Sequence, residues 1–293
     1  MISQIQTGVL LLNWDNNENI LCHVDELTNW NAPPSIIIVD NASKTDISGI
    51  ITKTFPEVTI IKNSVNLGFS GGNNIGFQYC ITEGYEYILL LNHDADISEE
   101  IVYTLLEEMK SEPRIGAIGP CIQEGSKRYV GGRNIAHYPT TRIPFDPSGP
   151  LLREVDYLPG AACILRVSAL EKVGVFDERY FFSGEMADLC LRIRDFGYSC
   201  VVHTGVCMTH DIKQNTPMRE RIHLYYSVRN RFLFIRKHER YVSLWMVIWI
   251  VFALCLILGV IIKKKPHSAK AALLGICDGL IGRFGDHNEY FTH

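Results

Sequence analysis

The sequence predicts an α/β fold built on a mostly parallel, doubly wound sheet. Over the first hundred residues, short apolar runs alternate with segments of helical periodicity, which is typical of strands joined by helices. The clearest run, YILLLNHDADI at residues 87–97, has no polar side chain in residues 88–91 and then becomes polar abruptly. Such a run is typical of a central parallel strand covered on both faces. Folds of this class bind ligands beyond the carboxyl ends of these strands, so the residues after Leu91 are candidates for a site.

The other elements are expected in a regular order. Apolar residues at helical spacing (Ile20, Val24 and Leu27) predict a helix after the first strand. A segment rich in Gly, Pro, Arg and Thr at residues 123–155 predicts a long loop or hairpin over the site. Gly197 is expected to end a late helix. The expected strands are 8–12, 35–39, 58–62, 87–97 and one that begins at Val201; the expected loop is 66–76; order returns at 160–166, and later helices are 168–173 and 185–196.

The C-terminal part carries a segment of membrane character. Val242–Ile262 has 21 residues and no charged side chain, which is long enough to cross the roughly 30 Å hydrocarbon layer. Arg and Lys number seven in residues 219–240 and five in residues 263–283, which favours one crossing with the N-terminal α/β domain in the cytosol. Because both flanks are basic, an in-plane or re-entrant helix stays open. We therefore divide the chain into an α/β domain (1–240) and a membrane segment with a short amphipathic tail (241–293).

Composition excludes some classes of partner. A formal net charge of −4 and a pI near 6.2 give no basic excess for nucleic acid. Nine cysteines form no CxxC pair and are odd in number, so neither a zinc site nor a disulfide framework is indicated. The N-terminus lacks a basic region and a long apolar run, so no signal peptide is expected.

Polar residues after the strands suggest a metal and nucleotide site. Asn92, Asp94 and Asp96 alternate after the central strand and offer oxygen ligands for a divalent cation that holds a diphosphate. Asp40 ends the second expected strand, where an acid can accept hydrogen bonds from a ribose or a base. The glycines of the 66–76 loop would let backbone N–H groups approach phosphate or sugar. The alternative for the acidic strand end is an ordinary loop with Ser98 as a helix cap.

Six segments in order give the chain a family resemblance: VDNAS, NLGFSGGNNIGF, LLLNHDAD, PGAACILR, VGVFDERYFFSGEMADLCLRIRDFGY and YYSVRNRFLF. Over residues 7–236 the chain resembles family 2 inverting glycosyltransferases, most of all the rhamnosyltransferase-type members that build bacterial surface polysaccharides. The resemblance implies a GT-A fold, a nucleotide-diphosphate sugar donor such as dTDP-rhamnose or a UDP-sugar, and Mg²⁺ or Mn²⁺. It also implies a lipid-linked or polysaccharide acceptor, a place at the bacterial inner membrane with the catalytic domain facing the cytoplasm, and leaves a homo-oligomer open.

The resemblance also implies roles for individual residues. Asp94 is the expected metal ligand, Asp96 is an additional candidate, and His210 matches a position where relatives place a metal-binding histidine. The residues expected to bind the nucleotide sugar are Asn13, Asp40, Asn41, Asn66, Gly68, Phe69, Gly71, Gly72, Asn73, Asn92 and His93.

The chain departs from the family at the catalytic acidic motif. Relatives carry Glu-Asp-x-Asp there, with the second residue as general base, whereas this chain has Glu185, Met186, Ala187 and Asp188. A thioether cannot accept a proton from an acceptor hydroxyl. Glu185 and Asp188 are three apart on one helical face, which tends to raise one pKa, so we expect Glu185 to be the base with Asp188 as the other candidate. Ser183 is expected to cap this helix.

The sequence is compatible with two functions of different class. The first is a metal-dependent inverting glycosyltransferase. The second is a nucleotide-sugar-binding scaffold in a membrane assembly that lost turnover when Met186 took the base position. A sugar nucleotidyltransferase is disfavoured, because residues 8–19 contain no basic, glycine-rich phosphate loop.

Overall fold

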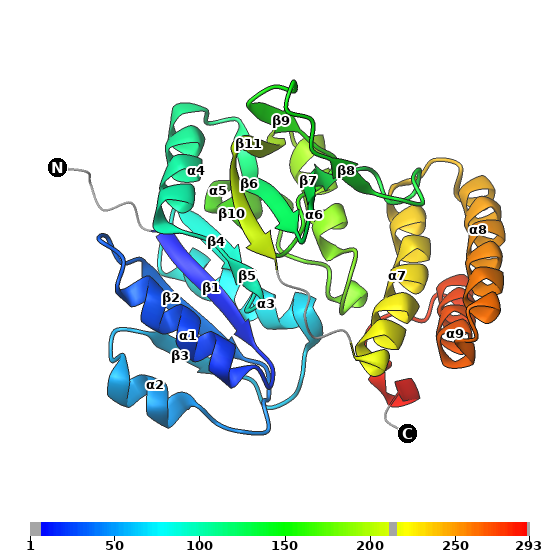
Figure 1. Ribbon diagram of the computed structural model, residues 1–293, viewed down its shortest axis with the longest axis horizontal. Coiled ribbons are helices and arrows are strands. Elements are labelled where there is room, and N and C mark those ends of the chain that lie inside the picture. Colours follow the sequence, from blue (N-terminus) through cyan, green and yellow to red (C-terminus); the bar gives the residue numbers. More distant parts are fainter. Residues whose placement is uncertain (1–6, 211–215, 292–293) are drawn as a thin grey trace.

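The computed structural model describes residues 7–210 and 216–291 and consists of an α/β body with a group of three helices at one side (Figure 1). Residues 1–6, at the N-terminus where no signal peptide is expected, lie outside these residues, as does Asp211, which follows His210 in the sequence. The strands are β1 Thr7–Asn13, β2 Ser35–Asp40, β3 Thr59–Lys62, β4 Tyr87–Leu91, β5 Ala95–Asp96, β6 Ile115–Glu124, β7 Lys127–Gly132, β8 Arg142–Pro144, β9 Leu152–Glu154, β10 Ala162–Arg166 and β11 Ser199–His210. The helices are α1 Asn17–Thr28, α2 Ser48–Thr54, α3 Gly68–Thr82, α4 Glu99–Ser111, α5 Val167–Val173, α6 Glu185–Asp195, α7 Pro217–His238, α8 Val242–Ile262 and α9 Pro266–Ile281, with 3-10 turns η1 Glu178–Tyr180 and η2 Asn288–Phe291.

One mixed sheet forms the centre of the body, in the order β3-β2-β1-β4-β10-β6-β11-β5. The pairs β3–β2, β2–β1, β1–β4 and β6–β11 are parallel, as the sequence predicts for a doubly wound sheet. Strand β10 is antiparallel to both neighbours, β4 and β6. The reason is the path of the chain, which enters β10 at the carboxyl end of β4: Ala162, the first residue of β10, pairs with Leu91, the last residue of β4.

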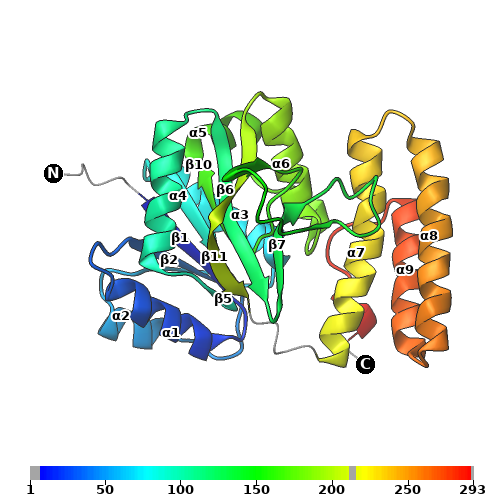
Figure 2. The same ribbon diagram turned by 45° about the horizontal axis from the view of Figure 1, so that its top comes forward.

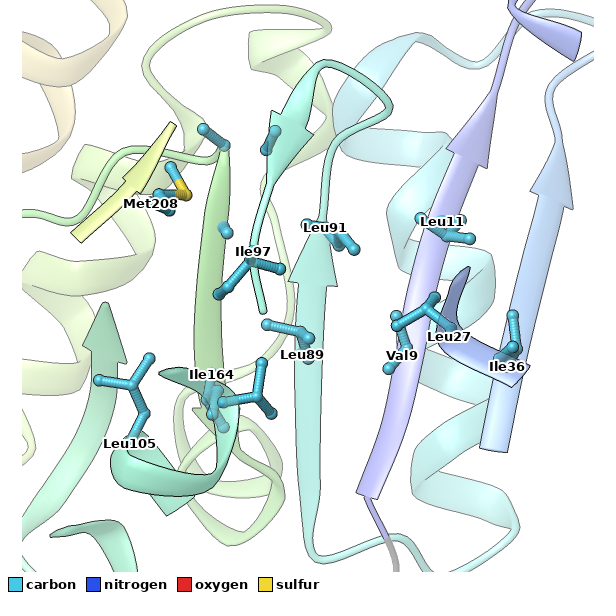
Figure 3. Close-up of a cluster of buried hydrophobic side chains, with 14 of the residues drawn as sticks. Val9, Leu11, Leu27, Ile36, Leu89, Leu91, Ile97, Leu105, Ile164 and Met208 are labelled. Carbon is cyan, nitrogen blue, oxygen red and sulfur yellow. The ribbon is translucent and has the colours of Figure 1, made fainter. Parts of the chain in front are cut away.

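Side chains of alternate residues in β1, β2 and β4 point to opposite faces and build two cores. On one face Val9, Leu11, Leu89 and Leu91 pack with α1, α2 and α4 (Figure 3). On the other face Leu10 and its neighbours pack with α3, α5 and α6. Because both faces are covered, the strand ends are the part of the sheet left available for polar residues.

The expected 66–76 loop is wrong over most of its length, because α3 begins at Gly68. The glycines serve close packing instead of loop conformation: a Cβ on Gly76 would lie 2.1 Å from Leu10 Cδ1, and one on Gly72 would lie 2.6 Å from Leu12 Cδ1. Gly68 itself has φ +72° and sits against Phe181, so the loop character is limited to the residues before the helix. A glycine-rich run can therefore mean a helix that lies flat on a sheet.

The expected hairpin and the later elements are present. Strands β7 and β8 pair with each other, and β7 pairs with β6, so residues 123–155 form a hairpin followed by the short β9. The start of α6 differs from expectation: Gly184, with φ +99°, is its N-cap residue, and no side chain caps it. Ser183 lies one residue too early to act as the cap, and its hydroxyl group is 3.2 Å from that of Ser227.

The three C-terminal helices α7, α9 and α8 lie side by side next to the body, with α9 between the other two (Figure 2). Within the described residues α8 is the one helix long and apolar enough to cross a membrane by length and composition, and 22% of its most apolar window is buried. Helix α7 lies upstream of residue 240, yet it packs closely on α9. A Cβ on Gly275 of α9 would lie 2.7 Å from the Tyr225 carbonyl oxygen.

Candidate active site

A cleft of about 390 Å³ opens beyond the carboxyl ends of β4 and β6, where the sequence predicts a site. Its floor comes from β4, β6 and the residues before β10, one wall from the β7–β8 hairpin, and the other from the starts of α6 and α7. The polar lining residues are Asn92, Asp94, Glu124, Tyr129, Arg142, Ser183, Glu185, His210, Arg219 and His223. Four expected site residues thus meet with Glu185 in one place: Phe69, Asn92, Asp94 and His210.

Charged groups of alternating sign run across the floor of this cleft. Asp94 lies 3.3 Å from His210 Nε2 and 3.4 Å from Arg219 Nη2. The other ring nitrogen of His210, Nδ1, lies 3.2 Å from Glu124, which also pairs with Arg142. The two carboxylates raise the pKa of His210, with the hydrogen bond to Asp94 as the main cause. Burial opposes ionisation of Asp94, but His210, His93 and Arg219 together lower its pKa to about 2.

This arrangement fits a divalent cation. Asp94 and His210 offer an oxygen and a nitrogen donor that face each other, and Glu124 holds the ring of His210 from behind, as carboxylates commonly do for metal-bound histidines. Within residues 7–210 and 216–291 no group of three or more His, Cys, Asp or Glu side chains forms a closed metal site. Two protein ligands suit Mg²⁺ or Mn²⁺ bound together with a substrate diphosphate and water.

Asp96 does not join this group. Its side chain is exposed, and its residue pairs with Thr209 at the sheet edge formed by β5 and β11. The expectation that Asp96 is an additional ligand finds no support in its position, because Asp96 does not line the cleft.

Glu185, the expected base, occupies the first turn of α6 at the cleft. The residue is 7% exposed, and its Oε2 atom has no hydrogen-bond partner. Burial raises the pKa of this carboxyl to about 7, and the nearby charge of Asp188 acts in the same direction. A carboxyl with a pKa near neutrality at a cleft can accept a proton at physiological pH. Met186, the next residue, is buried and contributes no polar atom.

Asp188, one helical turn later, has a different environment. Its carboxylate is fully buried and pairs with Arg192 at 2.9 Å, Lys237 at 2.5 Å and His238 at 2.7 Å. The hydrogen bond from His238 and the charges of Arg192 and Lys237 lower its pKa, although burial opposes the effect. Asp188 does not line the cleft and joins α6 to α7. Its position is that of a structural ion-pair centre, whereas Glu185 holds the position suited to proton transfer.

Most residues expected to bind the nucleotide sugar bind one another instead. Asn41 makes four side-chain hydrogen bonds: its oxygen accepts from Asn63 Nδ2 and Leu67 N, and its Nδ2 donates to Asn66 Oδ1 and the Gly68 carbonyl. This asparagine network fixes the chain between β3 and α3. Asn66 belongs to it, and Gly71 and Gly72 lie in the helix that it positions.

Asn13 and Asp40, at the ends of β1 and β2, are also buried and engaged. Asn13 donates to Asn17 Oδ1 at 2.8 Å, and Asp40 accepts from Ser43 N at 3.1 Å. Asn73 donates to the Phe69 carbonyl, and His93 contacts Asn19 at 3.3 Å. None of these four residues lines the cleft; their side chains form hydrogen bonds to neighbouring residues instead.

Three basic side chains on the two walls of the cleft were not predicted from the sequence. Arg142 comes from β8, and Arg219 and His223 come from α7. Burial and the charges of both arginines lower the pKa of His223, so the three groups face the same space. Arg219 and His223 precede YYSVRN by only a few residues, which is the one signal that could have drawn attention to them; nothing local marks Arg142 or Glu124.

Comparison with known proteins agrees with this geometry. The sequence profile described as glycosyl transferase family 2 matches residues 18–174, more than half of the chain. The chain is 24% identical to the low-salt glycan biosynthesis hexosyltransferase Agl10 of Haloferax volcanii, covering 95% of this chain and 92% of that protein. It is 24% identical to the dTDP-rhamnosyl transferase RfbF of Shigella flexneri, covering 85% and 87%. A Mycobacterium tuberculosis N-acetylglucosaminyl-diphospho-decaprenol L-rhamnosyltransferase is 25% identical, covering 73% and 77%.

Solved structures support the fold. The mannosyltransferase PcManGT from Pyrobaculum calidifontis, in complex with GDP-Man and Mn²⁺, superposes with a TM-score of 0.63 at 12% identity, covering 96% of this chain and 89% of that one. GalNAc-T7 with UDP, GalNAc and Mn²⁺ gives a TM-score of 0.59 at 12% identity, covering 72% and 44%. The expected GT-A fold is therefore confirmed, and this chain belongs to glycosyl transferase family 2.

Proposed function

We propose that this protein is an inverting glycosyltransferase that moves a sugar from a nucleotide-diphosphate donor to a lipid-linked or polysaccharide acceptor in bacterial surface glycan synthesis. The donor is dTDP-rhamnose or a UDP-sugar, in line with the rhamnosyl and hexosyl transferases among its relatives. The observation that carries the proposal is Glu185, a buried carboxyl with an unpartnered oxygen and a pKa of about 7, in the same cleft as Asp94 and His210.

In this mechanism Glu185 removes the proton from the acceptor hydroxyl as that oxygen attacks the anomeric carbon. The bond from the anomeric carbon to the diphosphate breaks on the opposite face, and the nucleoside diphosphate leaves with the bonding electrons. Glu185 lies at the start of α6, and Asp188 on the same helix is held by Arg192, Lys237 and His238, which keeps the base at a fixed place. Arg142 and Arg219 provide positive charge on the two opposite walls of the cleft.

We assign Asp94 and His210 as the residues that hold Mg²⁺ or Mn²⁺. The cation would neutralise the developing charge of the leaving diphosphate. Glu124 keeps the Nδ1 side of His210 engaged, which leaves Nε2 directed toward Asp94.

A panel of nucleotide sugars tests the proposal. Binding and donor hydrolysis would be measured for dTDP-rhamnose and several UDP-sugars, each with and without Mn²⁺. We expect one donor to bind in a metal-dependent way and to be hydrolysed slowly without acceptor. If no donor binds more tightly with Mn²⁺ than without it, the metal assignment fails.

The second candidate function, a nucleotide-sugar-binding scaffold, is favoured by Met186, because an apolar side chain stands where relatives carry the base. The two functions differ in turnover. If the natural chain binds a donor but never transfers it, while Met186→Asp gains transfer, the scaffold function is correct. If the natural chain transfers and Glu185→Gln does not, the enzyme function is correct.

We also propose that the protein associates with a membrane. The support is the apolar helix α8 and a relative whose name specifies a diphospho-decaprenol substrate. We place the protein at the bacterial inner membrane with its cleft facing the cytoplasm, and leave assembly into a homo-oligomer for measurement. We keep residue 240 as the boundary between the catalytic role and the membrane role of the chain. It does not separate two independently packed units, because α7 and α9 pack on each other across it.

A further inference from the structure

The exposed side of α8 is apolar along the whole helix. Its buried residues Met246, Trp249 and Ala253 face the neighbouring helices. The exposed stripe recurs at helical spacing and consists of Leu244, Val247, Ile248, Val251, Leu254, Leu258, Ile261 and Ile262, each at least 42% exposed. We call this set the outer stripe. A contiguous apolar surface of this length on one helix is typical of a binding surface.

A single crossing of the membrane by α8 conflicts with the path of the chain after this helix. Helix α9 runs back along α7, where a Cβ on Gly279 would lie 2.5 Å from Phe232 Cδ2, and Tyr225 donates a 2.6 Å hydrogen bond to Asp278. Beyond α9 the chain returns to the α/β body, because Gly285 N donates to the Arg179 carbonyl at 3.0 Å. Both ends of α8 are thus connected to parts that lie against the body (Figure 2).

Helix α7 cannot enter a membrane with α8. Asn230 donates to the carbonyl groups of Tyr180, Phe182 and Ser183, which fixes α7 to the segment before α6. The Lys237 ammonium and His238 pair with the buried Asp188. The three helices lie side by side, so a hydrocarbon layer around the full length of α8 would also surround these charged groups (Figure 2).

We infer that α8 lies in the plane of the membrane, with the outer stripe in one leaflet and α7, α9 and the α/β body on the same side of the bilayer. This inference rests on the membrane association in the proposed function. The occupant of the stripe is the headgroup and upper acyl region of a leaflet that contains anionic lipid. Exposed cations at the ends of α8, Arg240 on one side and Lys263 and Lys264 on the other, are placed to contact its phosphates.

The orientation also has a consequence for the cleft. Trp249 of α8 donates a 2.6 Å hydrogen bond to the Ala136 carbonyl in the β7–β8 connection, and Arg231 lies 4.0 Å over the Trp249 ring. The hairpin that forms one wall of the cleft is therefore attached to the membrane-bound helix. A lipid-linked acceptor held in the same leaflet would approach the cleft along this wall.

Vesicle flotation tests the stripe. The full chain would be mixed with phosphatidylcholine vesicles that contain a quarter phosphatidylglycerol. We expect the double variant Val251→Lys with Leu254→Lys to lower binding at least about tenfold, because two ammonium groups would enter the apolar leaflet. Ile50→Lys is the matched control: Ile50 is 52% exposed on α2, and its replacement should leave binding unchanged. Equal loss in the control, or no loss in the double variant, overturns the inference.

Thiol labelling tests the orientation. The exposed cysteines are Cys22, Cys255 and Cys277, so replacing the last two by Ser leaves Cys22 as a reporter of the catalytic side. A second variant replaces all three by Ser and adds Lys263→Cys at the end of α8. With a membrane-impermeant maleimide and sealed vesicles of known orientation, we expect both reporters to react from the same side.

The outcomes separate the inference from the proposed function. Labelling from opposite sides means that α8 spans the membrane, which overturns the in-plane orientation but keeps membrane association. Absence of flotation by the natural chain overturns membrane association itself, whereas donor binding and transfer are measured independently. A stable dimer that buries the outer stripe and excludes vesicles would show that a second copy is the occupant and would also overturn the inference.

Discussion

Buried polar atoms are fully hydrogen-bonded in the asparagine network around Asn41, whereas one at the start of α6 has no hydrogen-bond partner. Every side-chain polar atom of Asn41 has partners, with donor–acceptor distances of 2.8–3.0 Å. Glu185 is also buried, yet one carboxylate oxygen has no partner. A satisfied network stabilises one conformation, whereas an unsatisfied buried carboxylate costs stability and is retained only where the group has another use.

Asp188 makes the comparison sharper, because it lies one turn from Glu185 on the same helix. Its partners His238, Arg192 and Lys237 lower its pKa, while burial raises that of Glu185. Two carboxyls with pKa values moved in opposite directions are typical of a catalytic group and the structure that supports it. Substitution should therefore lower the rate at Glu185 and lower the stability at Asp188.

The largest effect is expected on turnover. Glu185→Gln removes the proton acceptor but keeps size and shape, so kcat should fall by about 10² to 10⁴ while the donor Kd changes little. In the natural protein kcat should rise with pH through about 7, as the Glu185 carboxyl loses its proton. Steady-state kinetics over pH 5–9 measures both. Full activity in Glu185→Gln would show that another group is the base.

Asp188→Asn should instead lower the free energy of unfolding by about 3 kcal/mol, because Arg192 and Lys237 lose a buried counter-charge. The folded-state pKa of Asp188 is lowered, so this stabilisation is present above the unfolded pKa and is lost as pH falls through the folded value. Urea unfolding from pH 7 down to about pH 2 tests this: the difference in stability between the two proteins should persist near pH 4 and shrink as pH falls further. A rate loss in Asp188→Asn like that of Glu185→Gln, without loss of stability, would make Asp188 the base.

Glu185→Gln should have the opposite effect on stability. The folded pKa is about 7 against an ordinary value of 4.5, so the unfolded chain releases this proton first and the folded state loses stability as pH rises between these values. The difference of about 2.5 pKa units corresponds to roughly 3 kcal/mol as an upper limit. The variant should therefore be more stable than the natural protein at pH 8 and equal to it at pH 4, as measured by thermal unfolding. Equal stability at both pH values would mean that Glu185 is ionised at no cost.

The sequence predicts the fold well because the strands are continuous apolar runs and the motifs mark their ends. It misplaced the 66–76 loop, since glycine content cannot separate a flexible loop from a helix that packs closely on Leu10 and Leu12. For the site, strand-end residues such as Asp94 were found from their position in the chain. Arg142 and Glu124 were missed because the hairpin brings them to the cleft through tertiary pairing. Asp96 was included because alternation alone cannot show that its side chain is exposed at the sheet edge.

Asn41→Ala should reveal how much the donor side depends on its network. The change removes an acceptor from Leu67 N and Asn63 and a donor to Asn66 and Gly68, so we expect a loss of about 2 kcal/mol in the free energy of unfolding. Because the loop before α3 then loses its fixed position, the donor Kd should rise several-fold while kcat at saturating donor changes little.

A matched control is Asn29→Ala, at the end of α1, whose amide makes one exposed hydrogen bond to the Asp25 carbonyl. It should leave donor affinity unchanged. Calorimetric donor titration together with urea unfolding measures both effects. If Asn41→Ala lowers kcat as strongly as Glu185→Gln, the asparagine network takes part in the chemistry, and the separation between structural and reactive polar groups fails.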